Sequence, residues 1–143
     1  MVNFKHPILR NAIGIITGIL VGGSVNMAII MSSSAIIPPP PGTNLTTEAG
    51  LIAAMPLMKP IHFLMPFLAH AFGTFVGALI ASLIAKTRQF VLSIIIGLQF
   101  FIGGAMMVYQ LPSPLWFNLT DLIGAYFPFA LFGYWMSLQL KNR

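Results

Sequence analysis

The charged residues of this chain are so few and so placed that four long stretches contain none. These stretches lie between Arg10 and Glu48, Lys59 and Lys86, Arg88 and Asp121, and Asp121 and Lys141. Charged residues make up 6% of the 143 residues, against about 25% in a typical soluble domain. So few charges cannot cover the surface of a soluble domain, whereas a bilayer crossing needs about 20 apolar residues. The sequence therefore predicts an all-α integral membrane protein.

Length and residue types exclude several classes of function. Residues 1–143 are expected to form a single transmembrane domain. Four crossings with short connections take up nearly all of these residues, so we expect no soluble catalytic domain beside them. Cysteine is absent, which excludes disulfides and thiolate metal sites. Two acids and three histidines supply few general acids, bases or nucleophiles. We therefore expect no enzyme activity, no cofactor and no metal site.

The expected crossings follow from the apolar runs and from the residues that interrupt them. They cover about residues 11–37, 61–85, 90–110 and 122–140. The prolines at 38–41 end the first crossing, because proline lacks the backbone donor and clashes with the preceding turn. In the loop that follows, Thr47 and Glu48 favour the start of a short helix lying on the membrane surface. A second loop, residues 111–121, leads to the last crossing. The result is a four-transmembrane-helix bundle with a proline-rich outer loop.

Basic residues predict the orientation of this bundle. Six of the seven fall on one side of a four-crossing topology: Lys5, Arg10, Lys86, Arg88, Lys141 and Arg143. An excess of lysine and arginine marks the cytoplasmic side, so both termini are expected there. The outer aromatic belt would contain Tyr109, Trp116, Phe117 and Tyr126. The net charge of +5 is therefore explained by basic residues that orient the protein in a lipid bilayer, and we expect no nucleic-acid partner. We favour a bacterial cytoplasmic (inner) membrane.

Small residues recur at helical spacing in the first three crossings, in part as GxxxG motifs. The packing residues are Gly14, Gly18, Gly22, Gly73, Gly77, Gly97 and Gly104. Hydrophobic burial cannot drive helices together inside lipid, so small residues matter because they let backbones approach closely. Such faces pack within one bundle, or they meet another membrane protein or a further copy of this chain. The opposite side of the second crossing, which includes Phe75 and Leu79, is expected to face lipid.

His70 is the most informative single residue, because it lies well inside the second crossing. An ionisable group at that depth is a functional-site hypothesis by default. The structural alternative is a neutral imidazole hydrogen-bonded to Asn26 or to a backbone carbonyl. A cation site would instead combine Asn26 and His70 within the membrane with Glu48, His62 and Asp121 at its outer mouth.

Two functions fit these observations. The first is an accessory or structural subunit of a membrane complex, or a homo-oligomer, that packs through its glycine-rich faces. The second is a small transporter or channel for a cation, proton or small solute that uses His70 and Asn26. A permeation path should contain more polar groups than these crossings supply, so the sequence favours the first function.

Overall fold

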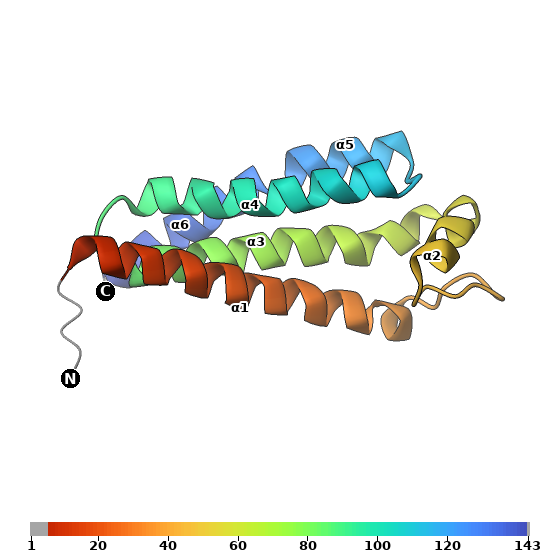
Figure 1. The fold of residues 1–143 in the computed structure, drawn as a ribbon, viewed down its shortest axis with the longest axis horizontal. Helices are drawn as coiled ribbons and strands as arrows, with labels where there is room; N and C mark the ends of the chain where they lie inside the picture. Colours follow the sequence, from red (N-terminus) through yellow and green to blue (C-terminus); the bar gives the residue numbers. More distant parts are fainter. Residues whose placement is uncertain (1–5, 143) are drawn as a thin grey trace.

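Four helical segments of the computed structural model, which describes residues 6–142, are long and apolar enough to cross a membrane. The elements are α1 (Pro7–Ile36), α2 (Glu48–Ala54), η1 (Met55–Leu57), η2 (Pro60–Phe63), α3 (Leu64–Ile84), α4 (Gln89–Gln110), α5 (Leu115–Gly124) and α6 (Phe127–Lys141). The spans pack as a helical bundle (Figure 1). The predicted all-α fold with four apolar spans is confirmed. Lys5 and Arg143, which entered the orientation argument, lie outside the described residues.

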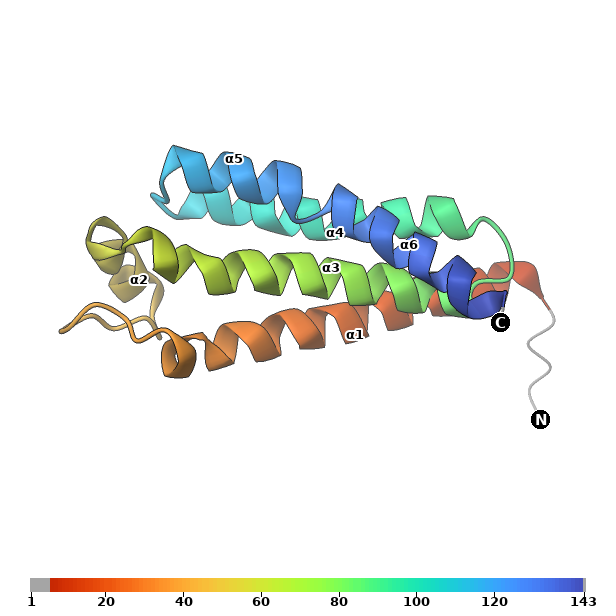
Figure 2. The same ribbon diagram turned by 180° about the vertical axis from the view of Figure 1, so that it is seen from behind.

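The central helix of the bundle is α3. It lies between α1 on one side and α4 and α6 on the other (Figures 1 and 2). In its most apolar stretch 44% of the residues are buried, against 17% in α1. The remaining spans are therefore arranged around α3, and its two sides decide how they pack.

The glycines of α1 bring that helix against α3. A Cβ atom added to Gly18 would lie 2.6 Å from the carbonyl oxygen of Gly77, and one added to Gly22 would lie 2.5 Å from that of Gly73. Gly14 meets the α3 backbone in the same way. No side chain larger than hydrogen fits at these distances, so the glycine faces of α1 and α3 are occupied inside a single copy of the chain.

The opposite side of α3 is covered by α6. A Cβ atom added to Gly133 of α6 would lie 2.5 Å from the carbonyl oxygen of Phe75 and 2.9 Å from the amide nitrogen of Leu79. The ring of Phe75 also stacks on Phe132, with ring centroids 5.1 Å apart. The expectation that this side faces lipid is wrong at Phe75 and Leu79, because a glycine in α6 allows a second helix to approach closely there. Leu64 and Phe72, which were expected to face lipid as well, are exposed.

The last span differs from the predicted one. We expected a loop over residues 111–121 and a helix from 122, but α5 begins at Leu115 and only residues 111–114 connect it to α4. The span is then broken at residues 125–126, between α5 and α6. Pro128 explains the break, because it has no N–H for the carbonyl of Gly124 and its ring would clash with that turn.

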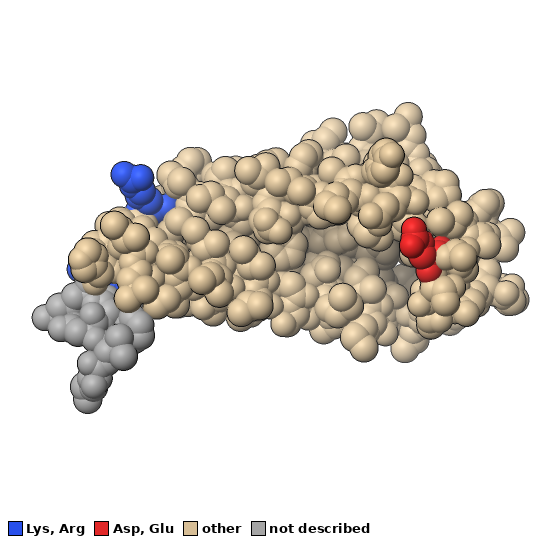
Figure 3. Space-filling view, viewed as in Figure 1, with Lys and Arg blue, Asp and Glu red and all other residues tan. Residues whose placement is uncertain are grey.

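Basic side chains close the end of the bundle where α1 begins and α6 ends. The guanidinium of Arg10 donates through Nε and Nη2 to the carbonyl oxygen of Ile84, at 3.0 and 2.8 Å. The Nζ of Lys141 donates to the carbonyl oxygens of Ser82 at 2.6 Å and Ala85 at 3.2 Å. These cations stabilise the C-terminal end of α3, whose last carbonyls lack intrahelical donors. In Figure 3 the visible basic side chains lie at this end and the acidic ones towards the other.

The opposite end carries α2, which confirms a short helix between the first two spans. Its N-terminus is capped by Thr47, whose Oγ1 accepts a hydrogen bond from the amide of Gly50 at 3.1 Å. Met55, Phe63 and Phe117 then form a buried apolar cluster. This cluster attaches the segment after α2 to α5 and to the start of the second span.

Candidate functional site

Three side chains form a hydrogen-bonded cluster between α3, α5 and the break before α6. The Nδ1 atom of His70 lies 2.9 Å from each carboxylate oxygen of Asp121. The hydroxyl of Tyr126 donates to Oδ2 of Asp121 at 2.8 Å and lies 3.0 Å from Nδ1 of His70. Asp121 is 2% exposed and Tyr126 is 1% exposed. A carboxylate is therefore buried between two hydrogen-bond donors.

The cluster lies deep within the second span. At about 1.5 Å per residue, the helix rises about 15 Å from Pro60 to His70 and about 21 Å from His70 to Ile84. The hydrocarbon core of a bilayer is about 30 Å thick, so a span that crosses it holds His70 far from both surfaces. A charge at that depth is stable only when it is paired or neutralised. A protonated His70 pairs the carboxylate of Asp121, and beside a neutral His70 the carboxylate keeps two hydrogen-bond donors.

The hydrogen-bond pattern relates the protons of the cluster to the charge of Asp121. Because Tyr126 donates its hydroxyl proton to Asp121, it does not also donate to His70. When Asp121 is ionised its carboxylate only accepts, and Nδ1 of His70 then carries a proton and donates it to Asp121. In the neutral tautomer Nε2 is then an acceptor, and its protonation turns the contact into an ion pair. His70 is thus able to take up a proton beside a carboxylate that compensates the new charge.

Local sequence explains how Tyr126 reaches this cluster. It follows α5 directly, in the break that Pro128 imposes, so its side chain turns inward between the two helices. Gly104 of α4 provides the space, because a Cβ atom at that position would collide with the tyrosine ring and its hydroxyl. Phe101 packs its ring edge against Tyr126, with centroids 5.9 Å apart. Gly104 therefore packs against a side chain of the cluster and not against another helix backbone.

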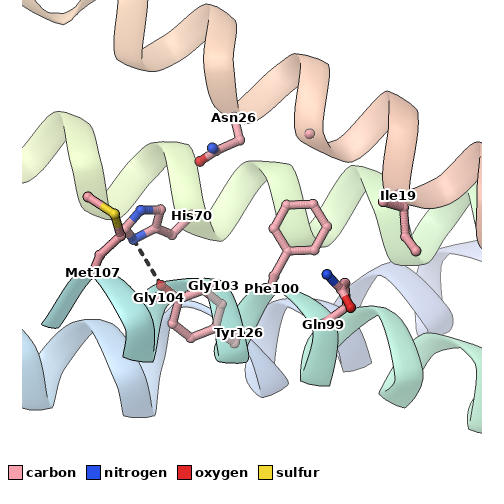
Figure 4. Close-up of a pocket in the computed structure, with 10 residues that line it drawn as sticks. Ile19, Asn26, His70, Gln99, Phe100, Gly103, Gly104, Met107 and Tyr126 are labelled. Carbon is pink, nitrogen blue, oxygen red and sulfur yellow. Dashed lines mark hydrogen bonds between the residues drawn. The ribbon is translucent and has the colours of Figure 1, made fainter. Parts of the chain in front are cut away.

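His70 opens onto a groove of about 310 Å³ between α1 and α4. Figure 3 shows the molecule hollowed between these helices, and Figure 4 shows Asn26 of α1 and His70 of α3 on the walls of the groove. Gln99, Phe100, Met107 and Tyr126 also line it. α1 and α4 both pack on α3 and touch each other near Gly18 and Ile96, and they leave a partly polar space beside the cluster.

Asn26 does not bind His70, although the sequence offered it as the neutral partner. Its Oδ1 atom is buried and has no hydrogen-bond partner in the described part of the chain. A buried acceptor without a donor costs free energy, and native structures rarely leave one unpaired. The oxygen of Asn26 is therefore a position where a bound molecule could supply a donor.

Glu48, His62 and Asp121 do not form the expected outer mouth. Glu48 is exposed in the first turn of α2. His62 contacts backbone atoms, with Nε2 3.2 Å from the carbonyl oxygen of Pro38 in the proline-rich loop. Asp121 lies with His70 instead, because α5 places it deeper than a loop residue before the last crossing would lie.

The remaining packing residue, Gly97, lies against α6. A Cβ atom there would be 2.9 Å from the Cβ of Ala130.

Tyr126 was expected in the outer aromatic belt and is instead buried in the cluster. Its role could not be read from spacing, because only the break before α6 brings it next to Asp121.

The cluster and groove combine a protonatable imidazole, a buried carboxylate and an unpaired acceptor. Within residues 6–142, no group of three histidine or acidic side chains is arranged to hold a metal ion. The arrangement suits proton exchange and the binding of a hydrogen-bond donor. Comparison with protein-family models, curated proteins and solved structures finds no match to this chain.

Proposed function

We propose that this chain is a small membrane transporter that moves a proton, or a small polar solute together with a proton exchange, along the groove between α1 and α4. The observation that carries the proposal is the His70–Asp121–Tyr126 cluster, which opens on that groove. Ionisable side chains inside membrane spans are rare, and they mark proton relays and substrate paths. Uptake of one proton by His70 changes the charge of the His70–Asp121 pair from −1 to zero, so protonation compensates the charge of the buried carboxylate.

The interruption of the last span supports transport over a purely structural role. Transporters commonly bind substrates where a membrane helix is discontinuous, because irregular backbone is tolerated only where it is buried in protein or lines a cavity. Here the break at residues 125–126 adjoins the cluster, and Pro128 leaves the carbonyl of Gly124 without its helical donor. This geometry supports transport, the second of the two functions that fit the sequence.

The proposed orientation places the start of α1 and the turn between α3 and α4 in the cytoplasm of a bacterial cell. Arg10, Lys86, Arg88 and Lys141 all lie at this end, and such an excess marks the cytoplasmic side. His70 is then nearer the outer surface than the inner one, since it is closer to Pro60 than to Ile84. Protons would reach the cluster from outside first.

Proton flux into liposomes tests this function. Reconstituted protein is expected to acidify the lumen, measured with an enclosed pH-sensitive dye, when a valinomycin-clamped potassium gradient drives a proton alone or when an outward solute gradient drives its exchange for a proton. His70→Gln and Asp121→Asn should each slow the flux at least about tenfold, since each removes a positioned proton-transfer group. His62→Gln is the matched control and should retain the wild-type rate. Equal rates for His70→Gln and wild type would contradict the proposal.

The second candidate function, an accessory subunit or a homo-oligomer, is favoured by the uncovered outer side of α1. Large apolar side chains on it are exposed, among them Ile16, Leu20, Met27 and Met31. Because the glycines of α1 already contact α3, an intermolecular contact would use these side chains instead. Lipid or another polypeptide covers them in the membrane.

Native mass spectrometry after gentle extraction tests this second function. A different polypeptide at fixed stoichiometry is the result expected for an accessory subunit, and further copies of the chain are expected for a homo-oligomer. Ile16→Ser combined with Leu20→Ser should reduce either assembly, whereas Ser24→Ala on the same helix should not. A monomer under every extraction condition would exclude both forms of this function.

A further inference from the structure

We propose that the groove binds a small organic cation that carries N–H donors, such as a primary amine in its ammonium form, next to Asn26 and His70. This inference rests on the proposed transport function and names the substrate class of the same site. It follows from the acceptors, the charge and the aromatic surface that the groove presents.

Two polar atoms beside the cluster, one on Asn26 and one on His70, can accept a hydrogen bond from a molecule in the groove. Oδ1 of Asn26 is buried and unpartnered among the described residues. Nε2 of His70 is an acceptor whenever Nδ1 donates to Asp121, and no hydrogen bond to Nε2 occurs within residues 6–142. Two unpaired acceptors on neighbouring helices, α1 and α3, favour a ligand that supplies two or more donors from one atom (Figure 4). An alkylammonium group has this property.

The charge behind these acceptors is negative. The side chains that contact the carboxylate of Asp121 within the described chain are His70 and Tyr126. With Asp121 ionised and His70 neutral the cluster carries one net negative charge, and no lysine or arginine of residues 6–142 lines the groove. Coulomb attraction in this low-dielectric setting favours a cation over a neutral or anionic solute.

Proton binding and cation binding at this site exclude each other. The titratable groups that face His70 are Asp121 and Tyr126, and the groove-lining residues of α1 and α4 are not titratable. When His70 is protonated, Nε2 becomes a donor and the cluster becomes neutral, so both the acceptor and the attraction are lost. Binding of an ammonium group is therefore coupled to release of a proton, which is the exchange that a proton–cation antiporter requires.

Size and surface chemistry favour an organic cation over a metal ion. A volume of about 310 Å³ is at the lower end for pockets that bind small molecules, about 300–1,000 Å³. Aromatic faces attract ammonium groups, and the rings of Phe100 and Tyr126 both line the groove. His70 is the one histidine or acidic residue among its lining residues, which is too few for a tetrahedral metal site.

Two glycines keep the groove open. A Cβ atom added to Gly23 of α1 or to Gly103 of α4 would meet nothing within 4 Å. Both residues line the groove, so a larger side chain at either position would fill the space without forcing the helices apart. Gly103→Leu is therefore expected to block binding because the leucine side chain fills the groove. Asn26→Leu is expected to weaken binding because it removes a hydrogen-bond acceptor.

The experiment uses the full chain in nanodiscs of phosphatidylcholine, whose headgroup has no N–H donor. Thermal unfolding is followed at increasing methylammonium chloride, with tetramethylammonium chloride and sodium acetate at matched ionic strength. Methylammonium should raise the unfolding midpoint in proportion to ligand binding, and the other two salts should not. Asn26→Leu should weaken the apparent Kd roughly 10- to 100-fold, the effect of losing a hydrogen bond to a charged group.

Control variants separate binding from folding. Gln139→Leu removes an exposed amide in α6 and should leave the methylammonium response unchanged, whereas Gly103→Leu should abolish it in a folded protein. Equal stabilisation by tetramethylammonium, or a wild-type response in both Asn26→Leu and Gly103→Leu, would overturn the inference. The same experiment in nanodiscs of phosphatidylethanolamine tests a lipid source, because that headgroup carries an ammonium group. If only this lipid stabilised the protein, and methylammonium did not, the groove would not bind soluble amines and the inference would be overturned. Proton flux that depends on His70 without any methylammonium response would leave the transport function standing and remove this inference alone.

Discussion

Gly18→Leu is expected to prevent α1 from docking on α3. A Cβ atom at this position would lie 2.6 Å from the carbonyl oxygen of Gly77 and 2.9 Å from the Cβ of Ala81, so the backbone of α3 itself blocks the new side chain. Overpacking in a well-packed core costs about 1–3 kcal/mol even where side chains can move, and a backbone carbonyl cannot move aside. Gly18→Ala should already lower the free energy of unfolding by about 2–3 kcal/mol, at the upper end of that range.

Unfolding in mixed micelles at increasing sodium dodecyl sulfate measures this effect, with the fluorescence of Trp116 and Trp135 as reporter. Gly23→Ala in the same helix is the matched control, because its new Cβ atom would meet nothing within 4 Å. Replacing a glycine inside a helix by alanine should stabilise that control by about 0.5–1 kcal/mol. Similar unfolding midpoints for Gly18→Leu and Gly23→Ala would show that α1 does not pack on α3 through its glycines.

Asp121→Ala is expected to destabilise the bundle by about 2–4 kcal/mol, because two hydrogen bonds of about 1–2 kcal/mol each are lost inside the membrane. The hydroxyl of Tyr126 is left buried without its acceptor, and Nδ1 of His70 loses both carboxylate contacts. Asp121→Asn should cost only about 1 kcal/mol, since its amide oxygen still accepts from Tyr126 and His70 can change tautomer to accept from the amide nitrogen.

The same unfolding assay measures these losses, and proton flux separates stability from charge. Asp121→Asn should remain folded while its flux is lost, which assigns the flux to the carboxylate and not to the fold. A double-mutant cycle of Asp121→Ala with Tyr126→Phe should give a coupling free energy of about 1 kcal/mol or more, because the two side chains share a hydrogen bond. Strictly additive losses would mean that the hydroxyl of Tyr126 stabilises the protein through some other contact.

The number of apolar spans and the positions of the first three could be predicted from the sequence. Four stretches without charge are long enough for a bilayer, and no soluble fold could bury them, so length and composition are sufficient. The short helix at Glu48–Ala54 was also predictable, because Thr47 and Glu48 are local signals that act within one turn. The glycines of α1 and α3 were recognisable as packing residues for the same reason, since their spacing puts them on one face of each helix.

Which helix meets which face was decided by tertiary structure. Periodicity identifies a face of α3 but does not say what covers it, and the side with Phe75 was assigned to lipid until Gly133 of α6 brought a helix against it. The site depended on such contacts even more. The sequence identified His70 by its depth, but its partner Asp121 is 51 residues away in the chain and was expected outside the membrane.

The break before α6 is the physical reason for that difference. A continuous last helix starting at 122 would leave Asp121 in a loop and Tyr126 in the outer aromatic belt. Pro128 instead interrupts the span and α5 begins earlier, so both side chains turn towards His70. Sequence alone determined that the chain has four apolar spans and an ionisable residue within one of them. Only the packing of α5 and α6 around α3 decided that this residue hydrogen-bonds to a buried carboxylate. The contact joins two helices far apart in the chain, and no local sequence pattern indicates that they are neighbours.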